Sequence, residues 1–169
     1  MTVPIGTIMA YAGKTDGTAA GQLQRQGWLI CDGNQYLQSN YPELNGVIGS
    51  YYGVASNAQF FRVPDLRGRF VRGVDGTAGR DPDTHERTAS GRGGNEGNNV
   101  GSVQEDEFKA HNHKFKNTTG NGNQDKKDAN TTGDIQKSGD ITASMMEAGG
   151  KETRPKNIYV NWIIKAKDV

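Results

Sequence analysis

The chain lacks most of the features that mark disulfide-rich, nucleic-acid-binding or membrane proteins. It has one cysteine, so no internal disulfide framework can form. Its 20 basic and 19 acidic side chains leave a net charge of +1, which argues against electrostatic binding to nucleic acid or an anionic membrane. No apolar run approaches the ~20 residues that span a bilayer, and no basic segment followed by an apolar one marks a secretory signal at the N-terminus. We therefore expect neither nucleic-acid partners nor membrane insertion.

Apolar residues are scarce as well. They make up 33% of the 169 residues, while glycine contributes 24. Two long polar segments, 76–100 and 117–148, contain almost no residue that could enter a core. The length fits one domain, or one domain with a long insertion. We expect a small core, much loop, and an oligomer in which contacts between subunits supply the missing burial.

The apolar residues that are present predict mainly strands. Alternating or β-branched runs favour strands at 3–12, 27–33, 59–63 and 152–166. The last is the strongest, because β-branched and aromatic residues follow Pro155 without a breaker. It is expected to close the core against the first two strands, with Trp28 as a core anchor.

Helices are expected to be short. One is predicted to begin near Asn40, with a proline in its first turn, and to end near Gly49. Its inward face would consist of Leu44, Val47 and Ile48. A second, of one or two turns, could follow Ser102 as N-cap over residues 103–110. Residues 13–21, rich in Gly, Thr and Ala, are interpreted as a loop.

The arginines between Pro64 and Gly73 alternate with glycine and aromatic residues. Such segments can stack on bases, but the neighbouring Asp65 and Asp75 favour pairing of arginine with carboxylate inside the protein. Leu66 and Phe70 are expected in the core. Cys31 lies in an apolar strand and is interpreted as a small buried hydrophobe rather than a nucleophile.

His111 and His113 form the most specific candidate site. In extended backbone, residues two apart point to the same face, so the two imidazoles could converge on one metal ion. The other histidine, His85, and the single cysteine lie at no short ligand spacing from the pair. Carboxylates and water could complete the shell, or three chains on a symmetry axis could supply six nitrogens, an octahedral set that suits iron(II), cobalt or nickel better than zinc. The alternative is a surface loop with two solvated histidines.

The sequence gives little support for an enzymatic function. Glu105, Asp106 and Glu107 are adjacent carboxylates, which general acid–base catalysis could use. Nothing in the sequence provides a pocket for them. The letters His-Asn-His also match the name of a nuclease family, but its three residues are spread over a ββα-metal unit rather than adjacent. A metal-dependent hydrolase therefore remains the weakest alternative.

Several ordered motifs together resemble the phage tail collar family. Each motif is weak alone, and the resemblance rests on the order in which the motifs follow one another. It covers nearly all of the chain outside 76–100 and 117–148. The motifs are Pro4-Ile5-Gly6-Thr7-Ile8, Gly27-Trp28-Leu29-Ile30-Cys31-Asp32-Gly33, Tyr41-Pro42-Glu43-Leu44, Phe61-Arg62-Val63-Pro64-Asp65-Leu66-Arg67-Gly68-Arg69-Phe70, His111-Asn112-His113 and Glu152-Thr153-Arg154-Pro155-Lys156-Asn157. The later motifs resemble the distal, receptor-binding parts of phage short and long tail fibres.

The resemblance implies an α+β fold: a small β-rich collar-type domain with one or two short helices and long polar loops, in an intertwined trimer. It implies a tail-collar domain at 1–75, and a loop-rich distal region at 76–169 that holds the His-x-His segment and the C-terminal strand. In such fibres, His-x-His segments of three chains bind an axial metal. Carried over to His111 and His113, this predicts one transition-metal ion per trimer, iron or zinc.

The function implied is that of a non-enzymatic structural and adhesive virion protein. The chain would be a tail-fibre or tail-tip module of a phage or related contractile injection system, made in the bacterial host cytoplasm and located in the virion tail. Its polar loops at 76–100 and 117–148 would face a host-surface glycan or another tail protein. The rival is a trimeric baseplate or fibre adaptor, or collar protein, whose partners all belong to the virion.

Overall fold

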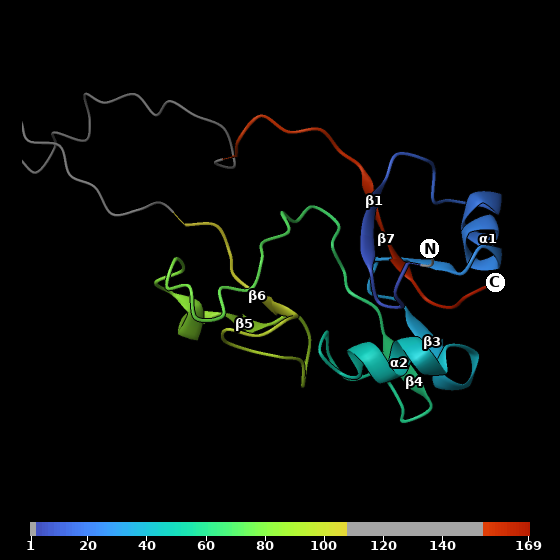
Figure 1. Cartoon of the computed structure of the whole chain (residues 1–169), viewed down its shortest axis with the longest axis horizontal. Helices are drawn as coiled ribbons and strands as arrows, with labels where there is room; N and C mark the ends of the chain where they lie inside the picture. The colour runs from blue at the N-terminus through green and yellow to red at the C-terminus, as the bar shows by residue number, and fades with distance from the viewer. Residues whose placement is uncertain (1–2, 108–153) are drawn as a thin grey trace, which may run out of the picture. The chain divides into compact units, whose positions relative to one another are not determined.

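A computed structural model describes residues 3–107 and 154–169 (Figure 1). Of these, residues 3–105 and 157–169 group into one compact unit, which contains all the helices and strands described below. Its elements in chain order are β1 (Ile8–Tyr11), α1 (Thr18–Arg25), β2 (Trp28–Ile30), β3 (Gln35–Leu37), the 3-10 turn η1 (Gln38–Asn40), α2 (Pro42–Ile48), β4 (Phe60–Arg62), the 3-10 turn η2 (Thr84–Glu86), β5 (Thr88–Ala89), β6 (Ser102–Val103) and β7 (Asn161–Lys165).

The two ends of the chain meet in one antiparallel sheet with the order β1-β7-β2. Ile164 of the central strand pairs with Ile8 on one side and with Leu29 on the other. The prediction that the C-terminal strand closes the core against both earlier strands is thus confirmed. Figure 1 shows the red β7 beside the blue β1.

The core forms between this sheet and α2. Leu29, Leu44, Val63 and Ile164 are each at most 1% exposed, and Cys31, Tyr41, Ile48, Phe61 and Ala166 complete the cluster. Helix α2 begins with Pro42 and ends at Gly49, whose φ of +45° favours glycine. The predicted helix is confirmed, although Tyr41 rather than Asn40 is its N-cap.

A second sheet of two strands, β3 and β4, flanks the core. Phe61 pairs with Tyr36 and is buried, and their rings lie 6.4 Å apart between centroids. Strand β4 ends before Pro64, as predicted. The fold is therefore mostly sheet with two short helices, as expected for an α+β collar-type domain.

Two secondary-structure predictions were wrong. Residues 18–25 form α1 rather than continuing a loop, because Ala, Gln, Leu and Arg favour helix and Leu23 is buried on one face. Residues 102–103 form β6 rather than a helix start, because Ser102 pairs with Ala89 of β5. Residues 104–107 are irregular.

Three predicted core residues lie largely outside the core. Alternation along β2 buries Leu29 and leaves Trp28 half-buried, with the Lys165 ammonium 5.6 Å from the centre of its ring. Val47 is 48% exposed, because the buried face of α2 is defined by Leu44 and Ile48 at i, i+4. Phe70 is 65% exposed.

Candidate functional site

The predicted metal ligands His111 and His113 lie outside the described residues. Among residues 3–107 and 154–169, no three His, Cys, Asp or Glu side chains converge as metal ligands would. His85 lies on the surface, with its Nε2 3.9 Å from a carboxylate oxygen of Glu86. The histidine metal site thus stays a prediction, as does the division into domains at residue 75.

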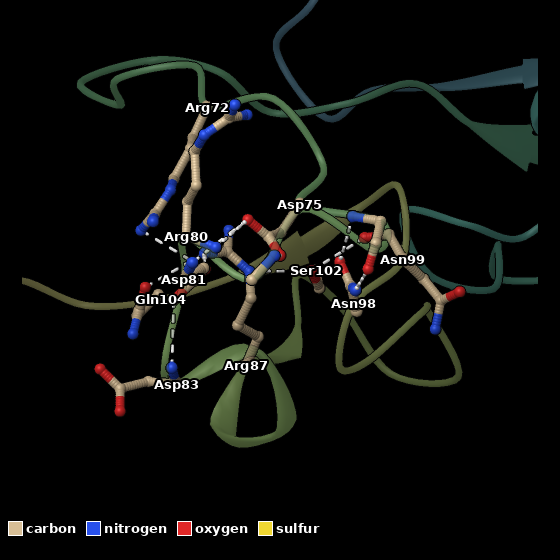
Figure 2. Close-up of polar contacts among 12 residues, drawn as sticks. Arg72, Asp75, Arg80, Asp81, Asp83, Arg87, Asn98, Asn99, Ser102 and Gln104 are labelled. Carbon is tan, nitrogen blue, oxygen red and sulfur yellow. Dashed lines mark hydrogen bonds and ion pairs between the residues drawn. The ribbon is translucent and has the colours of Figure 1, made fainter.

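A buried carboxylate organises the segment 75–104, which we call the polar segment. The Asp81 side chain is 5% exposed, and its Oδ2 lies 3.2 Å from Nη1 of Arg87 and 3.4 Å from Nη1 of Arg72 (Figure 2). Its other oxygen accepts a hydrogen bond from the backbone N–H of Asp83 at 3.2 Å. Two arginines and an amide thus compensate the desolvation of the charge.

Arg87 extends this network to the far end of the segment. Its Nε donates to Oγ of Ser102 at 3.1 Å and its Nη1 donates to Oε1 of Gln104 at 3.0 Å. The Ser102 hydroxyl in turn donates to the carbonyl of Asn99 at 2.9 Å. One largely buried guanidinium therefore holds together residues 15 to 17 positions apart in the chain.

Asp75 fixes the start of the polar segment. Its carboxylate accepts hydrogen bonds from the backbone N–H groups of Gly79, Arg80 and Asp81 at 2.8, 2.9 and 3.1 Å. These bonds, that from Arg80 foremost, lower the pKa of the Asp75 carboxyl. Since the folded-state pKa is lowered, the stabilisation is present above the carboxyl's ordinary pKa and is lost as pH falls through the folded-state value.

The polar segment also contacts the turn that follows α2. The N–H of Val54 donates to the carbonyl of Arg92, and that of Asn95 donates to the carbonyl of Tyr51. Asn98 exchanges two hydrogen bonds with the backbone of Gly76. The polar segment contributes almost nothing to the hydrophobic core, as the sequence predicted. Its defined backbone was not predicted from the sequence.

Pairing of arginine with carboxylate is confirmed in the stretch after β4. Arg67 contacts both oxygens of Asp65, at 2.8 Å from Nε and 2.6 Å from Nη2. The hydrogen bond from Arg67 is the main cause that lowers the pKa of the Asp65 carboxyl. The Nη2 atom of Arg69 lies 3.7 Å from Oε1 of Glu105. These arginines thus pair with carboxylates of the same chain and do not form a free basic patch.

Two stretches outside the helices and strands expose apolar side chains, and we call them the apolar segments. The first is 70–74, in which Phe70, Val71 and Val74 are 65, 56 and 50% exposed. The second is 158–160, just before β7, in which Ile158 and Tyr159 are 88 and 89% exposed. Isolated exposed apolar residues are ordinary, but contiguous runs mark interaction surfaces.

The candidate nucleophile and the candidate acid–base carboxylates can both be located in the described part of the chain. Burial, with help from the charges of Asp32 and Asp65, raises the pKa of the Cys31 thiol to about 12, so the thiol is inert as predicted. Glu105, Asp106 and Glu107 are exposed. The helices of the described residues are too short or too polar to cross a bilayer.

Comparison with known proteins finds the phage tail collar domain family over residues 6–71. The chain is 37% identical over 170 residues to protein RhiB of Rhizobium leguminosarum bv. viciae, covering 97% of this chain and 77% of RhiB. It is 30% identical over 197 residues to short tail fiber protein gp12 of Enterobacteria phage T4, covering 99% of this chain and 36% of the phage protein. The chain thus spans about a third of that fibre protein's length.

Proposed function

The chain belongs to the phage tail collar domain family, and from this we propose that it is a non-enzymatic structural module of a tail fibre or tail tip. The observation that carries the proposal is the extent of the similarity to the short tail fiber protein, which includes 99% of this chain and not the collar alone. The similarity to a Rhizobium protein is compatible with a phage-related contractile injection system as well as a phage.

We propose that the working form is a homotrimer, located in the virion tail and attached to other tail-fibre or baseplate proteins. The apolar segments support this, because side chains as exposed as Ile158 and Tyr159 gain free energy when a second copy covers them. Three copies also present three equal surfaces, so weak contacts with a host-surface glycan would add up to firm attachment. Binding of the purified trimer to host cells would distinguish this adhesive role from that of an adaptor with virion partners alone.

The purified chain is expected to sediment as a trimer, and the double variant Ile158→Ser/Tyr159→Ser as a monomer at the same concentration. Burying one such side chain is worth about 1.5–3 kcal/mol, so losing two per chain costs about 3–6 kcal/mol and weakens association by at least about a hundredfold. Analytical ultracentrifugation over a concentration series measures this. Val169→Ser, which removes a side chain that is 80% exposed outside the apolar segments, is the matched control. A monomeric wild type, or a double variant that still forms trimers equally well, would contradict the proposal.

We further propose that His111 and His113 of three chains bind one transition-metal ion, iron or zinc. Their alternation in the sequence is the support, since extended backbone would turn both imidazoles to one face. Elemental analysis of the purified trimer should find about one ion per three chains, and His111→Ala/His113→Ala should abolish it. His85→Ala is the control and should keep the metal. A metal-free wild-type trimer would remove the claim.

A further inference from the structure

We infer that a hollow beside α2 binds a neutral saccharide. The hollow has a volume of about 440 Å³ and lies between the C-terminal end of α2, the turn at 49–58 and β4, which are found around the cyan helix in Figure 1. This volume is in the range of about 300–1,000 Å³ that is usual for small-molecule pockets. The inference rests on the proposed function, for which it names a site and a class of ligand.

The hollow is lined with neutral polar groups. Its polar side chains are the amides of Gln38, Asn45 and Asn57 and the hydroxyl of Ser50, and none of its lining residues is charged. Amides offer two donors and an acceptor each, which is the complement that vicinal sugar hydroxyls require. An anion would need a cationic partner, and a purely apolar ligand would leave these groups without hydrogen bonds.

These polar groups retain hydrogen-bonding capacity. Within the described residues, the side chains of Asn45 and Ser50 have no hydrogen-bond partner in the protein. The Oδ1 of Asn57 accepts a hydrogen bond from the N–H of Gln59 at 2.9 Å, which leaves the NH₂ group of Asn57 available to donate to a ligand. Gln38 uses its Nε2 to donate to the carbonyl of Phe60 at 3.2 Å, which leaves its side-chain oxygen. The hollow thus presents both donors and acceptors.

The rest of the lining suits the C–H face of a sugar ring. Phe60 is half-buried at the wall, and aromatic rings are a common apolar platform for amphipathic ligands. Gly49, Gly53, Ala55 and Ala58 carry little or no side chain, so a ligand can approach the backbone. Amides for the hydroxyls and a ring for the C–H face together point to a neutral hexose or N-acetylhexosamine unit. The collar part, rather than only the polar loops, would then contact saccharide.

Saturation-transfer-difference NMR on the full-length protein tests this. Glucose, galactose, mannose and N-acetylglucosamine are each titrated to about 100 mM, well above the ~1 mM dissociation constant of a weak site. We expect saturation of the ring C–H protons of at least one sugar by the wild type. Asn45→Ala should weaken binding at least tenfold, and so should Asn57→Asp, which keeps the acceptor for the Gln59 N–H but removes the NH₂ donor. Gln22→Ala, an amide-to-alanine change on α1, should bind normally.

Either of two results would overturn the inference: no saturation transfer to any of the four sugars, or transfer that is unchanged in both hollow variants. Circular dichroism confirms that each variant is folded, so that a loss of signal reports on the site. Trimer formation and metal content are read out separately. A trimeric, sugar-blind protein would therefore refute the saccharide site and leave the proposed function standing.

Discussion

Replacing Asp81 by alanine is expected to unfold the polar segment while the sheet β1-β7-β2 stays intact. The substitution leaves the largely buried guanidinium of Arg87, whose side chain is 15% exposed, without its carboxylate, and removing one partner of a buried ion pair costs about 3–5 kcal/mol. The polar segment has few apolar contacts with which to absorb such a loss. It should therefore open locally rather than unfold the whole unit.

Hydrogen exchange followed by mass spectrometry measures this directly. Amide protection should be lost in peptides covering residues 75–104 and kept in those covering β7. Asp83→Ala is the matched control, because the carboxylate of Asp83 points away from the network in Figure 2, and such surface changes stay within about ±0.5 kcal/mol. The paired substitution Asp81→Leu/Arg87→Met removes both charges and should recover part of the protection. Unchanged exchange in Asp81→Ala would show that the network does not hold the segment.

The strands of the main sheet could be predicted because their signal is local. The run at the C-terminus is β-branched and aromatic, and its pairing with both other strands follows from a small core that needs one central strand. Which side chains of a strand enter the core depends less on the local sequence. Trp28 and Leu29 are equally apolar, and only the register of β2 against β7 decides that Leu29 points inward.

The polar segment could not be predicted for a different reason. The defined backbone of this segment depends on contacts between residues far apart in the chain, such as Arg87 with Ser102 and Gln104. No periodicity in the sequence marks such pairs. Few apolar residues implied few core contacts, and that inference was correct. It did not follow that the backbone was unspecified, because hydrogen-bonded carboxylates such as Asp75 can fix turns without a core. A dense run of Asp, Asn and Gly is the signal that could have indicated this.

The largest effect of a glycine substitution is expected at Gly27, which ends α1 and leads into β2. Its φ is +80°, a conformation that costs an alanine about 1–2 kcal/mol. Its carbonyl accepts from the N–H groups of Ala166 and Lys167, so the last strand passes very close to it. A Cβ at this position would overlap the carbonyl oxygen of Lys167 and lie 3.1 Å from Nζ of Lys165.

Gly27→Ala should consequently destabilise the fold by the backbone strain plus about 1–3 kcal/mol for the forced movement of the backbone at Lys167, just after β7. Gly68→Ala isolates the strain, because Gly68 has a φ of +69° but a Cβ there would meet no described atom within 4 Å. Urea unfolding followed by tryptophan fluorescence compares the two, with Trp28 and Trp162 both in the sheet that should come apart. Equal midpoints for the two variants would mean that the backbone of Ala166 and Lys167, just after β7, does not lie against Gly27 as described.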